Sequence, residues 1–376
     1  MPRLLYVVNI PRFFVSHRLP LALAARDTGY DVHVVTGTDD ANEVAKIDAS
    51  GLPFHALPLT QHGTNPLNEV RTIARLMSLY RSLQPDLVHH VSIKPVLYGG
   101  MASRFTSVKA VVSAMSGLGY VFIGDDQKRR LIRAGVLPLM RFALAGSNTR
   151  MIFQNPDDQA RFTSLGMIPI EKTVLVKGSG VDTDVYVPVP EREGLPVVLF
   201  AGRLMWQKGL GIFVEAAQSL KGKARFVVAG YAEKTSPDTV PVEQLQAWAD
   251  EGLIEWWGKR DDMPNVFAQS HIVTLPSIYG EGVPKVLIEA ASCGRAIITT
   301  DTPGCREIVA HQHNGLLVVP NDSAAFTQAI ASLLDNPDER ARLGANGREK
   351  VLAEFSMERV NTAILALYRT LLTPSA

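Results

Sequence analysis

The strongest constraint on the fold is the alternation of short apolar runs with helical stretches along the 376 residues. In the first half, four apolar runs have the composition of buried parallel strands, at residues 3–9, 31–36, 86–91 and 108–113. Helical stretches separate these runs, near residues 17–28, 65–83 and 95–105. This alternation predicts a doubly wound parallel sheet of the α/β class, in which ligands bind at the carboxyl ends of strands.

The same alternation begins again in the second half of the chain. Residues 186–196 contain three prolines and a charge cluster, which predicts a linker. Apolar runs then recur at residues 196–201, 224–230, 271–275 and 295–300. Since a domain takes roughly 150 residues, we expect two domains, over residues 1–185 and 195–356.

The composition is that of a globular protein, with 46% hydrophobic and 20% charged residues. Two cysteines, Cys293 and Cys305, supply no disulfide framework, which favours a reducing compartment. The sequence has no run of about 20 uncharged apolar residues, and residues 1–29 carry four arginines instead of a signal-peptide core. We therefore expect a cytoplasmic protein.

Charge is divided unevenly between the two halves, although the net charge is only +1. Residues 1–180 hold 20 Lys and Arg against 13 Asp and Glu, whereas the remainder holds 18 against 24. Within the basic half, residues 125–148 mix apolar residues with Lys128, Arg129, Arg130, Arg133 and Arg141. Such a stretch is typical of a segment in an anionic membrane interface. An ordinary helix covering the sheet, weakened by Gly135 and Pro138, is the alternative.

A glycine-rich loop and a helix over residues 276–294 follow one of the apolar runs of the second half. Glycines on both sides of Glu281 let the backbone approach a ligand closely, and a proline stands at the expected helix start. Helix N-terminal amides make such a loop an anion site. Glu289 lies eight residues after Glu281, so a phosphate between the amides and two carboxylates describes a site for a sugar nucleotide.

A second strand, loop and helix, around residues 196–209, place Arg203 and Lys208 beside a helix N-terminus. Fixed positive charge there would stabilise a leaving diphosphate without a metal ion. The dipeptide Asp261-Asp262 is the nearest acidic pair, and we expect it to cap a helix rather than to bind a metal.

The two glutamates, with Gly-Val-Pro between them, resemble the signature of the retaining nucleotide-sugar glycosyltransferases of family 4, which have the GT-B fold. The resemblance implies that Glu281 contacts the donor sugar and Glu289 the ribose, and that Arg203 and Lys208 clamp the diphosphate. It also implies that the turn at Gly258 frames uracil, although Trp256 nearby is equally consistent with a core residue. The predicted donor-binding residues are Gly202, Arg203, Lys208, Gly258, Lys259, Arg260, Gly282, Val283, Pro284, Lys285 and Glu289.

In the first half, residues 10–20 follow the first strand and lack the dinucleotide-binding pattern Gly-x-Gly-x-x-Gly. This departs from the Gly-Gly turn found in many family 4 members. We expect a loop here in which Ser16, His17 and Arg18 line the cleft near the acceptor or the diphosphate. The alternative is a loop whose two phenylalanines pack into the core.

Two histidines lie near the end of the strand expected at residues 86–91 and a lysine follows it, and His89 and Lys94 are candidate catalytic residues. A histidine that ends a strand is also often a satisfied structural residue. This stretch, together with Ser116 and Gly117, closely resembles a family 4 subgroup represented by bacterial N-acetylgalactosaminyltransferases that extend sugars on undecaprenyl diphosphate. We therefore include Ser116 and Gly117 among the expected acceptor residues.

The resemblance as a whole implies two Rossmann-like domains facing a cleft, with a last helix, residues 357–376, crossing back to the first domain. The implied reaction moves an N-acetylhexosamine, with N-acetylgalactosamine favoured, from a UDP-sugar to an undecaprenyl-diphosphate-linked saccharide, with retention and without a metal. The protein would be peripheral to the inner face of the bacterial plasma membrane and would bind no nucleic acid. Three alternatives remain: transfer of another hexose for lipopolysaccharide or capsule, a GT-B UDP-sugar epimerase, and a non-enzymatic binding subunit.

Overall fold

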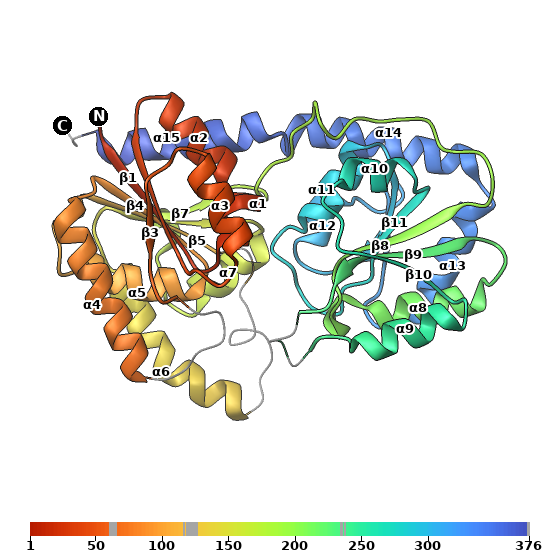
Figure 1. The fold of residues 1–376 in the computed structure, drawn as a ribbon, viewed down its shortest axis with the longest axis horizontal. Helices are drawn as coiled ribbons and strands as arrows, with labels where there is room; N and C mark the ends of the chain where they lie inside the picture. The colour runs from red at the N-terminus through yellow and green to blue at the C-terminus, as the bar shows by residue number, and fades with distance from the viewer. Residues whose placement is uncertain (60–65, 116, 118–126, 234–235, 237, 374–376) are drawn as a thin grey trace. The chain divides into compact units, whose positions relative to one another are not determined.

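The chain folds into two compact units, shown in a computed structural model that describes residues 1–59, 66–115, 117, 127–233, 236 and 238–373 (Figure 1). The first unit comprises Met1–Ser179 and Glu358–Ala376, and the second Gly180–Met357. Each unit holds one parallel β-sheet with helices on both faces. The predicted α/β class with two doubly wound, Rossmann-like sheets is confirmed.

The sheet of the first unit has the order β3-β2-β1-β4-β5-β6-β7, and every pair of neighbours is parallel. Its strands are β1 Arg3–Val8, β2 Asp31–Thr36, β3 Phe54–Ala56, β4 Leu87–Val91, β5 Ala110–Ala114, β6 Thr149–Phe153 and β7 Thr173–Leu175. The strand order reverses between β1 and β4, which is where ligands bind in sheets of this kind.

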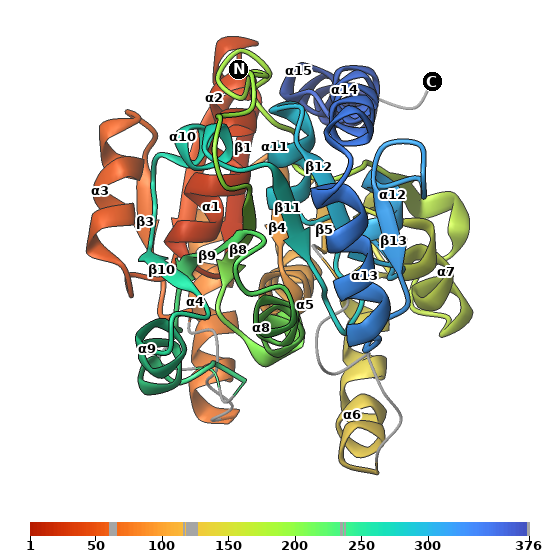
Figure 2. The same cartoon turned by 90° about the vertical axis from the view of Figure 1, so that its right-hand side faces the viewer.

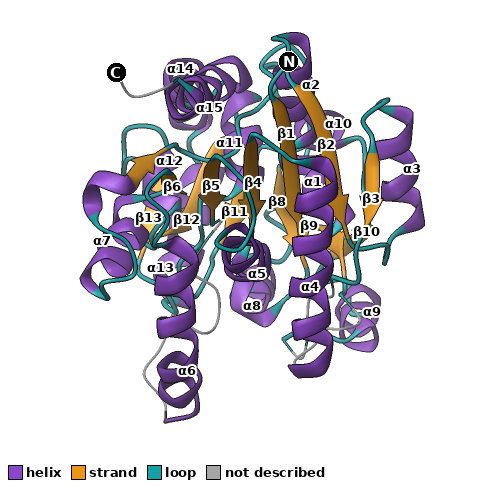
Figure 3. Ribbon diagram, turned by 90° about the vertical axis from the view of Figure 1, so that its left-hand side faces the viewer, coloured by secondary structure: helices purple, strands orange, loops and turns teal. Residues whose placement is uncertain are grey.

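Helices cover both faces of this sheet because successive side chains of each buried strand point to opposite sides (Figure 3). The helices are α1 Pro11–His17, α2 Leu19–Asp27, α3 Ala41–Ala49, α4 Pro66–Leu83, α5 Ile93–Ser103, α6 Gln127–Leu144, α7 Pro156–Ser164 and α15 Met357–Leu372. In β1, Leu4 and Tyr6 pack with residues of α2, α3 and α15, whereas Leu5 and Val7 pack with residues of α4 and α5. The last helix thus belongs to the core of the first unit.

The structure differs from the sequence-based predictions at two helices, α1 and α6. The stretch expected as a loop over residues 10–20 is helix α1, which is separated from α2 at Arg18. Helix α6 runs unbroken through Gly135 and Pro138, the residues expected to weaken it. Pro138 lies on the exposed side of α6, so water can solvate the backbone carbonyl that the proline leaves without an N–H donor.

The sheet of the second unit has the order β10-β9-β8-β11-β12-β13, again with parallel neighbours. Its strands are β8 Val197–Arg203, β9 Arg225–Tyr231, β10 Glu255–Gly258, β11 Ile272–Leu275, β12 Ala296–Thr300 and β13 Leu316–Val318. The main helices are α8 Leu210–Ser219, α9 Val242–Asp250, α10 Met263–Ala268, α11 Lys285–Ser292, α12 Cys305–Ile308, α13 Ser323–Leu334 and α14 Pro337–Glu354. Helix α8 packs beside α13, and α11 packs beside α14 (Figure 2).

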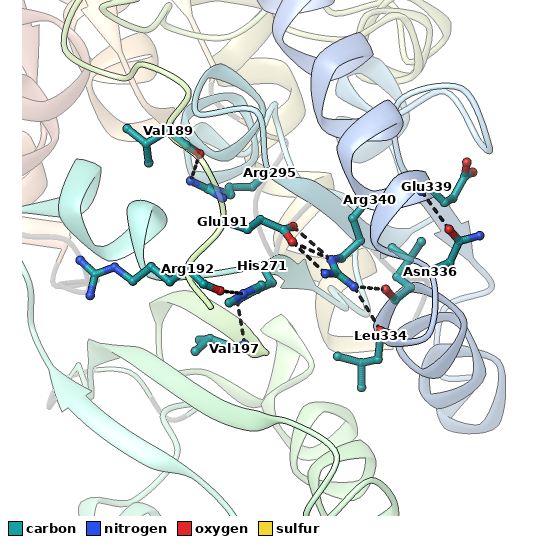
Figure 4. A network of polar contacts seen from close by, with 11 residues as sticks. Val189, Glu191, Arg192, Val197, His271, Arg295, Leu334, Asn336, Glu339 and Arg340 are labelled. Atoms are coloured by element: carbon teal, nitrogen blue, oxygen red, sulfur yellow. Dashed lines mark hydrogen bonds and ion pairs between the residues drawn. The ribbon is translucent and has the colours of Figure 1, made fainter. Parts of the chain in front are cut away.

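The proline-rich segment over residues 186–196 is fastened to the second unit (Figure 4). The carboxylate of Glu191 accepts hydrogen bonds from the guanidinium of Arg340 at 2.8 and 3.0 Å. Arg295 donates a hydrogen bond to the carbonyl oxygen of Val189 at 2.7 Å. Because both arginines are almost fully buried, they hold this segment on the second unit, where the sequence had suggested a flexible linker.

Candidate active site

Three loops meet at the carboxyl edge of the second sheet, where the strand order reverses between β8 and β11. The loop after β8 and the loop after β11 are in direct contact. Gly209 has a φ of +78°, and a Cβ placed on it would lie 1.9 Å from the carbonyl oxygen of Pro276. The N–H of Ile278 also donates to the carbonyl of Gln207 at 2.9 Å. Glycine at position 209 therefore permits the close approach of the two loops.

The loop after β12 supports the Glu281 loop from its other side. The N–H of Glu281 donates to the carbonyl of Pro303 at 3.0 Å. Gly304 has a φ of +83°, and a Cβ there would lie 1.8 Å from the carbonyl oxygen of Gly282. The backbone that carries Glu281 is thus held between two neighbouring loops.

The side chain of Glu281 has a defined set of polar partners. Its Oε1 lies 2.5 Å from Nζ of Lys208 and accepts a hydrogen bond from Oγ of Ser277 at 2.7 Å. Burial alone would raise the pKa of Glu281, but Lys208, Ser277 and the charge of Arg203 together hold that pKa below its ordinary value. Glu281 is therefore an ionised carboxylate at neutral pH.

Arg203 ends β8 and is the second cation at this edge. Its guanidinium lies 3.1 Å from a carboxylate oxygen of Glu233 and remains partly exposed. It is also close enough to Glu281 to lower the pKa of that carboxyl group. The structure thus brings Arg203 and Lys208 together with Glu281, which lies 73 positions after Lys208 in the sequence.

Helix α11 begins directly after the Glu281 loop, with Pro284 in the N-cap position and Val283 buried in front of it. Its first amide groups therefore lie at the end of the helix that the sequence predicted to bind an anion. Lys285 lies 3.3 Å from Glu289 one turn further along. Burial raises the pKa of Glu289, while Lys285 and the phenol of Tyr186 oppose that rise.

The turn after β10 carries the residues predicted to frame uracil. Gly258 has a φ of +67°, and Lys259 lies 3.5 Å from Asp261. Arg260 donates to both carboxylate oxygens of Asp262, at 2.7 and 2.6 Å. Asp262 occupies the N-cap position of α10 as expected, but its carboxylate bonds to Arg260 instead of accepting from the helix amides.

In the first unit, the residues predicted to line a cleft lie on or next to α1. Oγ of Ser16 lies 2.6 Å from Nδ1 of His17, whose ring stacks on Phe13 with the ring centroids 4.1 Å apart. Phe14 is fully buried, which confirms the core alternative for that residue. Arg18 is only 3% exposed, and burial lowers its pKa, so it lies inside the first unit and does not line an open surface.

His89, predicted as a catalytic residue, is enclosed in the core of the first unit. Its Nδ1 hydrogen-bonds to the hydroxyl of Tyr368 on α15, and that hydroxyl lies 3.1 Å from the hydroxyl of Tyr6. Burial lowers the pKa of His89 well below its ordinary value, so the imidazole is neutral. Nε2 of His89 is buried without a hydrogen-bond partner among the described residues, so only one nitrogen of this core histidine is satisfied.

The remaining predictions for the first unit concern Lys94, Gly117 and Ser116. Lys94 lies in the first turn of α5, and its Nζ is 2.9 Å from a carboxylate oxygen of Glu69 on α4. Gly117 has a φ of +113°, a conformation that glycine adopts readily. Ser116 lies outside the described residues.

Sequence reasoning missed several residues that shape this site. Ser277 donates a hydrogen bond to Glu281, Gly304 abuts the Glu281 loop, and burial together with the nearby charge of Glu289 raises the pKa of Tyr186. Of these residues, only Ser277 could have been found from the sequence, because it lies two residues after the end of a predicted strand, where ligands bind. Trp256 packs against the core of the second unit and donates from Nε1 to the carbonyl of Gly230 at 3.2 Å, in keeping with the core alternative.

Comparison with known proteins identifies both halves of the chain. Residues 3–155 match the family described as Glycosyl transferase 4-like, and residues 195–336 match Glycosyl transferases group 1. The N,N'-diacetylbacillosaminyl-diphospho-undecaprenol alpha-1,3-N-acetylgalactosaminyltransferase of Campylobacter jejuni is 25% identical over 376 residues, covering 94% of this chain and 97% of the relative. The UDP-Gal:alpha-D-GlcNAc-diphosphoundecaprenol alpha-1,3-galactosyltransferase of Escherichia coli is 27% identical over 319 residues, covering 80% of each chain.

Two solved structures with the same fold match almost the whole length of this chain. Sucrose-phosphate synthase from Thermosynechococcus elongatus superposes with a TM-score of 0.80 at 20% identity, covering 98% of this chain and 99% of the other. Anabaena HepE in complex with UDP-glucose superposes with a TM-score of 0.79 at 18% identity, covering 98% and 100%. The family matches and the paired Rossmann-like sheets agree, and the chain belongs to the group 1, family 4-like glycosyltransferases, hexosyltransferase enzymes of the GT-B fold.

Proposed function

We propose that the chain transfers an N-acetylhexosamine, with N-acetylgalactosamine favoured, from a UDP-sugar to a saccharide linked to undecaprenyl diphosphate. The Campylobacter jejuni relative, matched along nearly its whole length, is named for that activity. The Escherichia coli relative is named for transfer of galactose to a different diphosphoundecaprenol-linked sugar. Since the two names share the acceptor class and differ in the donor, the acceptor class has the broader support.

The observation that carries the proposal is the cluster of Arg203, Lys208 and Glu281 at the reversal between β8 and β11. Two cations beside the N-terminus of α11 suit a nucleoside diphosphate, whose charge grows as the sugar leaves. In our assignment Arg203 and Lys208 meet the diphosphate, and Glu281 holds the sugar hydroxyls and orients the anomeric carbon. Glu289 accepts hydrogen bonds from the ribose hydroxyls. Fixed protein charge then replaces a metal ion in stabilising the leaving group.

The proposed transfer retains the configuration of the anomeric carbon. The bond from this carbon to the diphosphate oxygen breaks, and a bond to the acceptor hydroxyl oxygen forms on the same face. A β-phosphate oxygen takes the proton of that hydroxyl. Because the carboxylate of Glu281 already contacts Lys208 and Ser277, we assign it an orienting role and favour this front-face path over a covalent intermediate.

We also propose that the first unit attaches peripherally to the inner face of the plasma membrane through α6. Leu131, Leu139 and Phe142 are exposed on this helix, and Arg130 is exposed beside them. Arg133, by contrast, is only 7% exposed, so it cannot contribute to lipid binding as the sequence suggested. The side chains of Lys128 and Arg129 lie outside the described residues. Among the residues that the structure describes, no helix combines the length and apolarity needed to cross a bilayer.

A panel of nucleotide sugars tests the proposal directly. The purified protein is incubated with each UDP-sugar, with and without a synthetic polyprenyl-diphosphate-linked saccharide, and the products are read by mass. We expect the acceptor to gain one N-acetylhexosamine, and only when a UDP-N-acetylhexosamine is present. A gain of a different hexose would revise the donor, and conversion of the donor without an acceptor would indicate the epimerase alternative. No conversion with any donor would contradict the proposal.

A further inference from the structure

A surface pocket of the second unit lies between α8 and the end of α9 (Figure 2). Its volume is about 570 Å³, within the range of small-molecule sites. From α8 it is lined by Gly211, Val214, Glu215 and Gln218, which share one helix face at positions i, i+3, i+4 and i+7. The described residues that line the pocket include none of those assigned to the sugar nucleotide.

Two tryptophans form the aromatic part of this pocket. Trp206 is 40% exposed, although tryptophan side chains are usually largely buried. Its ring meets the ring of Trp248 edge to face, with the centroids 6.0 Å apart. Within the part of the chain that the structure describes, the indole N–H groups of Trp256 and Trp257 donate hydrogen bonds, whereas those of Trp206 and Trp248 do not. The pocket therefore presents two indole donors to a ligand.

Two carboxylates line the same pocket, those of Glu215 and Glu251. Both residues are exposed, and neither side chain has an ion pair or a hydrogen bond to another described residue. The ammonium group of Lys221 donates to the backbone carbonyl of Glu251 at 3.3 Å instead of pairing with a carboxylate. Since carboxylate oxygens accept hydrogen bonds and indole N–H groups donate them, the pocket suits a ligand rich in hydroxyl groups.

The combination of aromatic rings and carboxylates favours a saccharide over an anionic ligand. The C–H groups of a pyranose ring pack against the negative face of an indole, while its hydroxyls bond to carboxylates and to indole N–H groups. A phosphate is disfavoured because the described lining residues include two carboxylates and one lysine. A quaternary ammonium ion is the other ligand that tryptophan and carboxylate side chains recognise, and the experiment below separates the two.

We propose that this pocket is a saccharide-binding site of the second unit, separate from the donor site. A hexose ring packs on Trp206, and its hydroxyls bond to Glu215 and Glu251. The site holds a saccharide independently of the nucleotide, because it uses none of the residues assigned to the diphosphate, the donor sugar or the ribose. The inference therefore goes beyond the proposed transfer reaction and does not depend on it.

The four tryptophan side chains make the site directly observable by nuclear magnetic resonance. The full-length protein, isotopically labelled at the indole nitrogens, is saturated with UDP and titrated with the disaccharide N,N′-diacetylchitobiose. We expect the indole signals of Trp206 and Trp248 to shift with one dissociation constant, and those of Trp256 and Trp257 to stay in place. Single tryptophan-to-phenylalanine variants assign the signals. No shift, or shifts confined to Trp256 and Trp257, would overturn the inference.

The substitution Glu215→Ala tests the carboxylate contact. Affinity for the disaccharide should fall about tenfold, the size expected when one hydrogen bond to a charged group is lost. The matched control is Glu349→Ala on α14, another exposed glutamate inside a helix without an ion pair among the described residues. This control should leave disaccharide affinity unchanged, and thermal unfolding shows whether both variants are folded. Equal disaccharide affinities of Glu215→Ala and the wild-type protein would overturn the assigned contact.

A parallel titration with tetramethylammonium chloride distinguishes a cation site. If tetramethylammonium shifts the signals of Trp206 and Trp248 and the disaccharide does not, the pocket takes cations and the inference is wrong. A protein that does not respond to UDP but still shows the disaccharide shifts would overturn the proposed function alone and support this inference.

Discussion

Gly304→Ala should disable the enzyme through the backbone of the neighbouring loop. A Cβ at this position would lie 1.8 Å from the carbonyl oxygen of Gly282 and 2.5 Å from that of Glu281. Since Cβ atoms essentially never approach other heavy atoms within 3.0 Å, the Gly304 segment and the Glu281 loop must separate by at least about 1.2 Å at this contact. A displacement of about 1 Å at a reacting group costs on the order of 10²-fold in rate. We therefore expect kcat/KM for sugar transfer to fall about 10²-fold.

Gly222→Ala is the matched control for this prediction. Gly222 has a φ of +82°, against +83° for Gly304, but a Cβ on it would meet nothing within 4 Å. Both substitutions place an alanine at a positive φ, but the ψ of −44° at Gly304 lies outside the left-handed helical region, so its backbone cost is the larger, and thermal unfolding measures the stability of each variant. Only Gly304→Ala should lose transfer activity, followed by mass with a lipid-linked acceptor. Equal activities of the two folded variants would refute the reasoning that Gly304 positions Glu281.

Three further predictions follow from the site and from α6. Lys208→Met should lower turnover by about 10²-fold with the fold intact, as expected for loss of one fixed charge that stabilises the leaving group; near-normal kinetics would remove Lys208 from the clamp. Glu281→Gln should reduce transfer more than UDP affinity, whereas Glu289→Gln should weaken UDP binding in calorimetry, and the reverse pattern would exchange their roles. The double substitution Leu131→Ser and Phe142→Ser should reduce co-sedimentation with anionic liposomes. Binding of the wild-type protein to these liposomes should also weaken in 1 M salt, where the Debye length is about 3 Å. If neither the double substitution nor the high salt concentration reduces liposome binding, α6 is not the membrane contact.

Local patterns in the sequence predicted most of the second unit. Each apolar run there became a parallel strand, and the loops after β8 and β11 carry Lys208 and Glu281 to the same sheet edge. This prediction succeeded because a strand, its loop and the following helix are contiguous in the chain. Gly304 was missed because it abuts a loop that lies elsewhere in the sequence.

The histidines of β4 show why the positions of side chains in the first unit were harder to predict from the sequence. Both lie near the carboxyl end of β4, so both were expected at the ligand edge of the sheet. Side-chain alternation instead turns His89 toward Tyr368 on α15 and His90 toward Tyr80 on α4. The sequence cannot show that a helix some 270 positions later supplies the partner of His89. In α6, likewise, Arg133 is buried whereas Arg130, nearly one turn earlier on the same helix, is exposed, a distinction that composition alone did not reveal.

The most direct test of the account is the configuration of the first product formed when chelator is present in excess. The protein is incubated with α-linked UDP-N-acetylgalactosamine and a polyprenyl-diphosphate-linked saccharide, and nuclear magnetic resonance of the new anomeric proton identifies the linkage. We predict an α-linked N-acetylhexosamine on the acceptor, formed at the same rate with and without divalent metal, because Arg203 and Lys208 stabilise the leaving diphosphate. A β-linked product, or activity that appears only after Mg²⁺ or Mn²⁺ is restored, would contradict the account.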